Sequence, residues 1–337
     1  MTDNKITTVE LGNGGPQVGV QGLGCMGMSE FYGDTDESAA RETLETALAA
    51  GVTLFDTADV YGRGANETFL APFVGAHRGE ITLATKFAIE RTDDPQYRGV
   101  RNDPAYIRQA VEDSLRRLNT DVIDLYYMHR RDPAVPLAES VGAMAELVRQ
   151  GKVKQLGLSE VTGAELREAY AVHPIAALQS EWSLFSRDVE RSAVPAAVEL
   201  GVTFVPYSPL GRGFLTGAFT DAAKDLSDGD FRKYQPRFTG DNAKTNAALL
   251  EPVHKIAAAH GASAAQVALA WVQQRAQVHG LTVVPIPGTR KSSRLLENVA
   301  ATRLTLTAEE LALLEPIAGQ VAGDRYPDMS STSAARE

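Results

Sequence analysis

The stretch Val52-Thr-Leu-Phe-Asp56-Thr-Ala-Asp-Val-Tyr61-Gly62 begins as a short apolar strand and continues into a polar loop. Its first four residues are β-branched, apolar or aromatic and follow a glycine, as is typical of a buried strand. Asp56 stands where the strand ends, and Tyr61 follows in a glycine-containing loop. The stretch therefore predicts a strand that presents a carboxylate and a phenol at its carboxyl end.

Two later segments repeat this arrangement with other ionisable residues. Ile81-Thr-Leu-Ala-Thr-Lys86 is a strand signal that ends in a lysine, and Val122-Ile-Asp-Leu-Tyr-Tyr-Met-His129 ends in a histidine. If the strands are parallel, their carboxyl ends meet at one face, which is where α/β folds carry their chemistry. We therefore expect the acid, the lysine and the histidine to lie together.

Strand and helix signals alternate along most of the chain. Eight strand signals occur, nearly all followed by a helix signal, at 20–25, 52–56, 81–86, 122–129, 153–159, 176–180, 202–207 and 281–286. Such alternation requires a parallel sheet, because each crossover helix returns the chain to the same edge. Eight units over about 250–320 residues predict an α/β fold of the (β/α)8 TIM-barrel type.

The segments outside the repeats extend this barrel. Residues 6–20 flank Gly12-Asn-Gly-Gly-Pro16 and predict an N-terminal β-hairpin. An extra C-terminal helix is expected at about 307–321, and the tail, about 322–337, is expected to be flexible. A long polar stretch at 211–245 interrupts the alternation before helical segments at 246–260 and 263–276. No linker-like segment divides the chain, so 1–337 is expected to be a single domain.

Gly22-Leu-Gly24-Cys-Met-Gly27 matches the G-x-G-x-x-G pattern of dinucleotide-binding Rossmann units. Its context argues against that interpretation, because the preceding strand signal is weak and no helix signal begins at Gly27. The favoured explanation is a glycine-rich strand end where another group packs close to the backbone. For the parallel strands as a whole, the main alternative to a barrel is a doubly wound open sheet.

Composition and charge argue against nucleic acid and a membrane as partners. The 337 residues carry a net charge of −10, which argues against a broad nucleic-acid surface. No apolar run approaches the ~18 residues of a membrane span, and the N-terminus lacks signal-peptide features. The one cysteine, Cys25, cannot form an internal disulfide, which favours a reducing, cytoplasmic location. We expect no metal site, and the sequence does not indicate an oligomeric state.

Asp56, Tyr61, Lys86 and His129 each have a structural explanation when taken singly. Together, at the ends of neighbouring barrel strands, they predict a catalytic site. A tyrosine has a pKa near ~10, and an adjacent ammonium lowers it. Lys86 can supply that charge, Asp56 can keep Lys86 protonated, and His129 can orient a carbonyl oxygen. The set predicts protonation of an oxygen on which negative charge develops. A hydride would have to come from a cofactor.

Two downstream segments predict a dinucleotide site. In Val205-Pro-Tyr207-Ser-Pro-Leu-Gly-Arg-Gly213, Tyr207 offers a flat face for a nicotinamide ring, and the glycine-rich loop offers N–H groups to a pyrophosphate. Pro285-Ile-Pro-Gly288-Thr-Arg290-Lys291-Ser-Ser-Arg294 places three cations where a helix begins, and helix N-termini attract anions. A solvated basic turn is the alternative. A 2′-phosphate, and hence NADP(H), would explain the density of charge.

The sequence resembles the aldo-keto reductases over roughly residues 6–320. The motifs that carry the resemblance are Phe55-Asp-Thr-Ala-Asp-Val-Tyr61-Gly, Ala84-Thr-Lys86, Leu125-Tyr-Tyr-Met-His129-Arg, Gly157-Leu-Ser159, Gln179-Ser-Glu, Tyr207-Ser-Pro-Leu-Gly-Arg-Gly213 and Ile286-Pro-Gly-Thr-Arg290. The resemblance implies a barrel that binds NADP(H) without a Rossmann fold. It also implies Tyr61 as general acid, supported by Lys86 and Asp56, with His129 orienting the carbonyl.

Further roles follow from the resemblance alone. It implies that Ser159 and Gln179 hold the nicotinamide carboxamide and that Tyr207 stacks on the ring. The remaining implied cofactor contacts are Ser208, Leu210, Gly211, Gly213, Gly288, Thr289, Arg290, Arg294, Glu297 and Asn298. Many relatives have Asn where this chain has Glu160, and a carboxylate cannot donate to an amide oxygen. Either Glu160 is protonated, or Gln179 supplies the donor.

The expected activity is NADPH-dependent reduction of an aldehyde or ketone, a small-molecule substrate. Met26, Phe31, Tyr32, Phe87, Trp182 and the 211–245 stretch are candidate pocket residues, and they favour a hydrophobic or aromatic carbonyl. Two alternatives from other classes remain. One is a cofactor-binding subunit with slow turnover that acts through a protein partner. The other is a Schiff-base lyase that uses Lys86.

Overall fold

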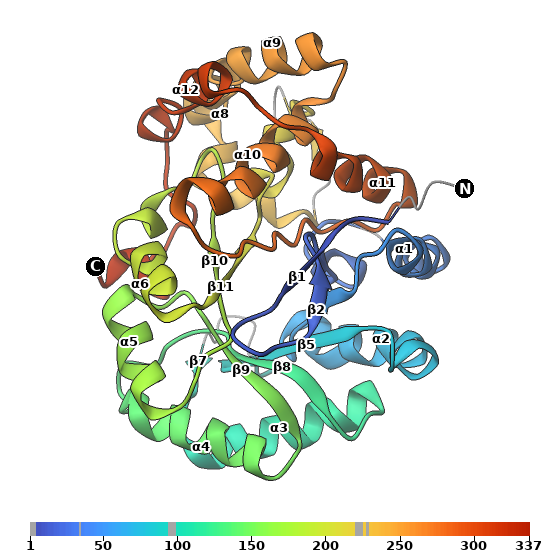
Figure 1. The fold of residues 1–337 in the computed structure, drawn as a ribbon, viewed down its shortest axis with the longest axis vertical. Coiled ribbons are helices and arrows are strands. Elements are labelled where there is room, and N and C mark those ends of the chain that lie inside the picture. Colours follow the sequence, from blue (N-terminus) through green and yellow to red (C-terminus); the bar gives the residue numbers. More distant parts are fainter. Residues whose placement is uncertain (1–4, 34, 94–98, 220–224, 227–228) are drawn as a thin grey trace.

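The computed structural model describes residues 5–33, 35–93, 99–219, 225–226 and 229–337. Within them, seven parallel strands form one curved sheet in the order β11-β10-β9-β8-β5-β4-β3. The strands are β3 (Leu23–Gly24), β4 (Leu54–Asp56), β5 (Thr82–Phe87), β8 (Ile123–Met128), β9 (Val153–Ser159), β10 (Ala177–Glu181) and β11 (Thr203–Tyr207). Helices surround this sheet (Figure 1).

Residues 282–286 close the sheet into a barrel. The amides of Val284 and Ile286 donate to Phe204 and Pro206 of β11 at 2.9 and 3.0 Å, and the Gly22 amide donates to Pro285 O at 2.9 Å. This segment is not a regular strand, because Pro285 and Pro287 have no N–H to give to a ladder. The predicted TIM barrel is therefore confirmed, with an irregular eighth strand.

The barrel closure also explains the G-x-G-x-x-G pattern. A Cβ atom on Gly24 would lie 2.9 Å from Ile286 O, and one on Gly22 would lie 2.9 Å from the Ile286 side chain. These glycines allow the first and last barrel strands to approach each other. A Rossmann unit and an open doubly wound sheet are both excluded by this geometry.

Helices cover the outside of the barrel because their apolar faces pack on the outward side chains of the strands. They are α1 (Glu37–Ala49), α2 (Ala65–His77), α3 (Pro104–Leu118), α4 (Leu137–Arg149), α5 (Gly163–Val172), α6 (Ala193–Leu200), α10 (Ala264–His279) and α11 (Ser292–Ala300). Helix α3 is representative. Asp103 caps its amino end, Asn119 ends it in a left-handed conformation, and Ile107, Val111 and Leu115 form its buried face.

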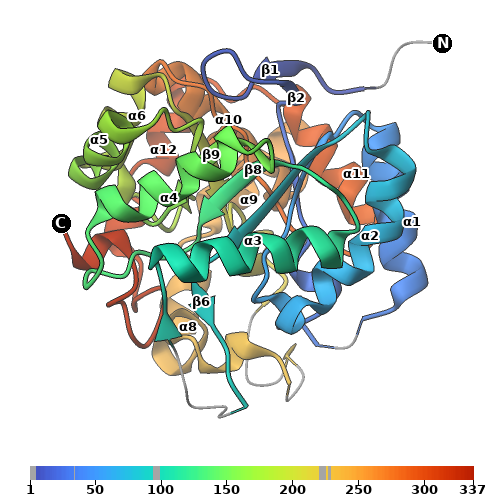
Figure 2. The same cartoon turned by 90° about the horizontal axis from the view of Figure 1, so that it is seen from below.

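The strands divide the core into two parts. Leu54, Ala84, Leu125 and Val205 point into the barrel, whereas their chain neighbours, such as Phe55 and Phe204, point to the helices. The predicted N-terminal hairpin is present as β1 (Thr8–Glu10) and β2 (Gln17–Gly19), and it closes the amino end of the barrel. Figure 2 shows this hairpin at one end, and β6 (Ile89–Glu90) and α8 (Gly240–Ala248) at the other, which is the mouth. A short strand, β7 (Gly99–Val100), pairs with β6.

The region after β11 differs from the predicted pattern. Three short 3-10 turns, η4 (Gly211–Thr216), η5 (Phe231–Tyr234) and η6 (Pro236–Phe238), cross the mouth before α8. The expected helix at 246–260 is divided between α8 and α9 (Glu251–His260). The final helix, α12 (Ala308–Leu314), is shorter than the expected 307–321, because Pro316 cannot continue a helix. Residues 220–224 and 227–228 lie outside the described part of the chain.

The C-terminal segment also differs from the expectation of a flexible tail. Arg325, Thr332 and Ser333 are buried, and Ser333 begins the short turn η9 (Ser333–Ala335). The chain ends close to α5 and α6 in Figure 1, and Arg336 donates to Glu165 of α5 at 3.0 Å. The cause is a set of polar contacts with strand ends far away in sequence, described below. Among the described residues, no helix is long and apolar enough to cross a membrane.

Candidate active site

The four predicted catalytic side chains lie together at the carboxyl end of the barrel. The Lys86 ammonium contacts the Asp56 carboxylate, donates to Thr57 O at 2.8 Å and lies 3.5 Å from the Tyr61 hydroxyl. The Tyr61 and His129 rings meet edge to face, with centroids 5.9 Å apart. All four side chains are buried. Strands β4, β5 and β8 are neighbours in the sheet, which is why their ends converge.

The turn after β4 fixes the position of Tyr61. Gly62, Arg63 and Gly64 adopt left-handed conformations, with φ of 57°, 54° and 88°. Such a run reverses the chain sharply and is accessible mainly to glycine. The Gly62 amide donates to the Glu30 carboxylate at 2.8 Å, which anchors the turn to the loop after β3. The left-handed turn and its hydrogen bond to Glu30 therefore fix the backbone that follows Tyr61.

Asp56 and Lys86 form a fully buried ion pair. Burial raises the pKa of Asp56 and lowers the pKa of Lys86, and in each case the charge of the partner offsets part of the shift. The Gln179 amide donates to the second carboxylate oxygen of Asp56 at 2.9 Å. Removing either member of such a pair leaves a buried charge without compensation.

Tyr61 and His129 are shifted away from their charged forms. Burial, followed by the Asp56 charge, holds the pKa of Tyr61 well above its usual value. The direction is opposite to the expected lowering of the Tyr61 pKa by Lys86, because burial and the Asp56 charge outweigh the nearby cations. Burial, Arg130 and Lys86 hold the pKa of His129 well below its usual value, so its imidazole is neutral. Its buried Nδ1 has no hydrogen-bond partner in the described part of the chain.

The side chains expected to hold a nicotinamide carboxamide lie on the next strands. Ser159 ends β9, Gln179 lies on β10, and the two are paired directly in the sheet register. The Ser159 hydroxyl accepts a hydrogen bond from Arg130 at 3.3 Å. Tyr207 ends β11 and donates from its hydroxyl to Glu160 at 2.8 Å.

The loop after Tyr207 has the backbone of an anion-binding turn. Ser208, Gly211, Arg212 and Gly213 are all left-handed, with φ of 48°, 55°, 59° and 90°. Turns that combine such residues gather N–H groups on one concave side. Within the same loop, Leu210 is partly buried.

Arg212 contacts three segments that meet at the mouth. Its guanidinium lies over the rings of Tyr326 and Phe231, 4.4 and 5.3 Å from their centroids, and pairs with Glu181 at 3.2 Å. The tail, the β11 loop and the 229–238 segment therefore meet at one cation.

The three cations expected at the adenosine end do not act as one cluster. Arg290 donates to the carbonyls of Gly27, Tyr32 and Gly33 at 3.1, 2.8 and 3.3 Å, and so fastens the loop after β3. Lys291 and Arg294 are exposed at the beginning of α11. Gly288 is exposed and Thr289 is half-buried just before them.

Glu297 and Asn298 follow on α11. The Glu297 carboxylate accepts from the Ser263 hydroxyl, and its carbonyl accepts from Gln266 at 3.1 Å, so Glu297 is tied to the start of α10. Asn298 is buried, with 4 % of its surface exposed.

The predicted pocket aromatics separate into two groups. Phe87 and Trp182 are fully buried in the core, where Phe87 stacks on Tyr126 and Trp182 packs on Phe204. Phe87 occupies a β5 position that points to the helices, and Trp182 directly follows β10; both belong to the core between strands and helices and not to the mouth. Met26, Phe31 and Tyr32 lie at the mouth, and the Phe231 amide donates to Phe31 O at 3.2 Å.

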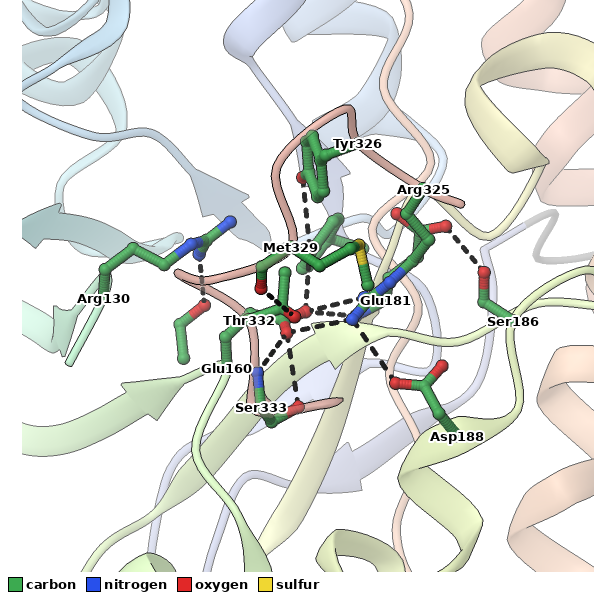
Figure 3. A network of polar contacts seen from close by, with 12 residues as sticks. Arg130, Glu160, Glu181, Ser186, Asp188, Arg325, Tyr326, Met329, Thr332 and Ser333 are labelled. Carbon is green, nitrogen blue, oxygen red and sulfur yellow. Dashed lines mark hydrogen bonds and ion pairs between the residues drawn. The ribbon is translucent and has the colours of Figure 1, made fainter. Parts of the chain in front are cut away.

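Glu160 has a role that the sequence did not indicate (Figure 3). Its carboxylate accepts from Arg325 at 3.0 and 3.3 Å, from the Ser333 amide at 3.1 Å and from Tyr207. Burial alone would raise the pKa of Glu160, but Arg325 and Arg130 lower it to about 2. Glu160 is therefore ionised, and its acceptor sites are taken by the tail. The only sequence signal for this role was that Glu160 stands where many relatives have Asn.

Comparisons with known proteins agree with this geometry. The model of the aldo/keto reductase family matches residues 22–318, so the chain belongs to this family. The glycerol dehydrogenase of Gluconobacter oxydans is 27% identical, with 97% of this chain and 99% of that chain covered and a TM-score of 0.81. An aldo-keto reductase of Bacillus halodurans, solved in its holo form, is 26% identical over 96% of this chain and 100% of its own, with a TM-score of 0.74.

A third similar structure carries a nucleotide. The aldo/keto reductase of Klebsiella pneumoniae, solved in complex with NADP and acetate, is 26% identical, with 95% of this chain and 98% of that chain covered and a TM-score of 0.69.

Proposed function

We propose that this protein reduces an aldehyde or ketone to an alcohol with NADPH, and that Tyr61 donates the proton. The observation that carries the proposal is the contact of Lys86 with Asp56, Thr57 and Tyr61 at the barrel mouth. A buried phenol, a buried ammonium and a neutral imidazole are an arrangement suited to stabilising charge on a carbonyl oxygen.

The donor set fits a nicotinamide dinucleotide. The buried His129 Nδ1 has no hydrogen-bond partner among the described residues, and the left-handed loop at Ser208–Gly213 has a backbone suited to binding an anion. Ser159, Gln179 and Tyr207 would hold the nicotinamide end, and Lys291 and Arg294 would hold the 2′-phosphate. When bound, the cofactor supplies a hydride.

The residues of this chain perform the proton chemistry. Because the pKa of Tyr61 is raised, its hydroxyl stays protonated at neutral pH and donates only to a strong base, such as a developing alkoxide. Lys86 then stabilises the resulting phenolate, since its ammonium is 3.5 Å away. Neutral His129 donates a hydrogen bond to the carbonyl oxygen and so orients it.

The contacts of Lys86 favour the reductase over the Schiff-base lyase. A nucleophilic lysine needs a free, neutral amine. The Lys86 nitrogen instead lies against a carboxylate, a carbonyl and a phenol, which hold its protons. Borohydride should therefore trap no carbonyl substrate on Lys86.

A spectrophotometric screen tests the proposal. NADPH oxidation is followed with a panel of aromatic, aliphatic and acidic aldehydes and ketones, and each product alcohol is identified by mass. Deuterium at C4 of the nicotinamide should appear in the alcohol. If NADPH binds tightly but no member of the panel is reduced, the protein is not a reductase of this class, and a cofactor-binding subunit becomes the better description.

A further inference from the structure

Arg130 is a buried guanidinium without a carboxylate partner. It is 8 % exposed, and its Nη1 donates to His129 O at 2.7 Å and to the Ser159 hydroxyl at 3.3 Å. No carboxylate oxygen of the described residues lies within 4.0 Å of it. The nearby Arg212 pairs with Glu181, and Arg325 pairs with both Glu160 and Asp188. A buried cation without a partner is costly. Its position therefore points to an acceptor that a ligand brings.

The surroundings of Arg130 identify the kind of acceptor. Arg130 follows β8, Ser159 ends β9 and Gln179 lies on β10, three consecutive strands of the sheet. If Ser159 and Gln179 hold a nicotinamide carboxamide, as proposed above, the group beside Arg130 is that same amide. An amide presents a carbonyl oxygen, which needs a donor, and an NH2 group, which needs acceptors.

The other candidates for the donor are partly or wholly engaged elsewhere. One N–H of the Gln179 amide already donates to Asp56 at 2.9 Å. Glu160 is the next residue after Ser159, but its carboxylate only accepts, and it is occupied by Arg325, Ser333 and Tyr207. Figure 3 shows Arg130 beside this network and apart from the Glu160–Arg325 pair. Arg130 instead donates to the Ser159 hydroxyl at 3.3 Å.

We propose that Arg130 donates a charge-assisted hydrogen bond to the carbonyl oxygen of the nicotinamide carboxamide, while Ser159 and Gln179 accept from its NH2 group. This inference rests on the proposed cofactor. Arg130 is then a positioning residue that fixes the rotation of the carboxamide and, with it, the face of the ring. Its charge also disfavours the cationic ring of NADP+, so it favours binding of NADPH over NADP+.

Binding measurements test this role without relying on turnover. Arg130→Met removes every donor, and Arg130→Lys restores one. Each variant is titrated by calorimetry with NADPH, NADP+ and 2′-phosphoadenosine-5′-diphosphoribose, which lacks the nicotinamide. Arg130→Met should weaken NADPH binding at least about tenfold, as expected for a lost hydrogen bond to a charged donor, and should leave the nicotinamide-free analogue unchanged. The preference for NADPH over NADP+ should shrink, and Arg130→Lys should recover part of both effects.

Arg131→Met is the matched control. Arg131 lies in the same loop but donates to Val135 O at 2.6 Å, so its loss should leave both ligands unaffected. Equal weakening of NADPH and the analogue by Arg130→Met, or no weakening of NADPH, would overturn the inference. If Arg130→Met does not fold, the wild-type protein is titrated with NADPH and with its thioamide analogue, whose sulfur is a poor acceptor. The analogue should bind more weakly, and equal affinity for the two would also overturn the inference.

The two proposals fail in different ways. A wild-type protein that binds NADPH and reduces carbonyls, with no selective defect in Arg130→Met, refutes only the role of Arg130. A wild-type protein that binds neither nucleotide refutes the proposed function, and the role of Arg130 with it.

Discussion

Arg325 and Glu160, 165 residues apart in sequence, form a buried two-pronged ion pair, with nitrogen–oxygen distances of 3.0 and 3.3 Å. Glu160 directly follows Ser159 of β9, and Arg325 precedes Tyr326, whose ring covers Arg212 at 4.4 Å. The pair therefore joins the C-terminal tail to the end of a barrel strand. Through it, a segment outside the barrel becomes part of the wall of the mouth.

Replacing Glu160 by Gln should release the tail. The change leaves Arg325 buried without its main counter-charge, which costs about 3–5 kcal/mol in comparable pairs. Hydrogen exchange should quicken at the Ser333 amide, which donates to Glu160 at 3.1 Å, and across 325–336. Glu168→Gln, on the exposed face of α5, is the control and should change neither the stability nor the hydrogen exchange of the tail. Unaltered protection of the tail in Glu160→Gln would refute the importance of this contact.

Acid should weaken the same contact. The pKa of Glu160 is about 2 in the folded protein, against an ordinary value of 4.5. A lowered carboxyl pKa contributes stability that is complete above pH ~4.5 and is lost as the pH falls towards ~2. The contribution is on the order of 3 kcal/mol. Urea unfolding of the wild type and Glu160→Gln should therefore converge as the pH falls from about 5, and a constant difference would contradict the assignment.

Sequence patterns anticipated the barrel and the four catalytic candidates, because both depend on local signals. Strand periodicity located the parallel strands, and Asp56, Lys86 and His129 stand at strand ends that must converge. The tail was beyond such reasoning, since its polar composition suggests disorder and only the long-range contacts of Arg325 and Ser333 oppose it. Pro285 and Pro287 explain why the eighth strand is irregular, although the sequence gives its position.

Cofactor preference should depend on Arg294 more than on Arg290. Arg294 is exposed at the start of α11, so Arg294→Ala should weaken NADPH about tenfold, near ~1.5 kcal/mol, and leave NADH almost unchanged. Arg290→Ala should weaken both, because Arg290 fastens the loop after β3. Fluorescence titration with both nucleotides measures this, with Lys255→Ala on α9 as control. A selective NADPH defect in Arg290→Ala alone would reverse the assignment.

Lys86→Met should abolish most turnover. The variant leaves Asp56 without a counter-charge and removes the cation that stabilises the Tyr61 phenolate. Because Lys86 and Tyr61 act as a unit, the double variant with Tyr61→Phe should be little slower than either single variant. Steady-state rates of the three variants give the comparison, with Lys152→Met at the exposed pair with Glu112 as control. Fully additive losses would indicate that the two side chains act independently.

The electrostatics of Tyr61 could not be predicted from residue types. A lysine beside a tyrosine suggests a lowered phenol pKa, but the direction depends on where the Asp56 charge lies and on burial. Similarly, the sequence shows Glu160 where many relatives have Asn, but it does not show that Arg325 is its partner. Three-dimensional contacts between distant segments decide both cases.

The single-turnover rate of Tyr61→Phe tests the central claim most directly. The variant keeps the ring and removes the proton, so NADPH should bind as in the wild type. Hydride transfer, identified as rate-limiting by a deuterium isotope effect, should slow by at least about 10²-fold, the usual contribution of a positioned acid. A near-normal rate with that isotope effect present would contradict the account and assign the proton to another group, with His129 the nearest candidate.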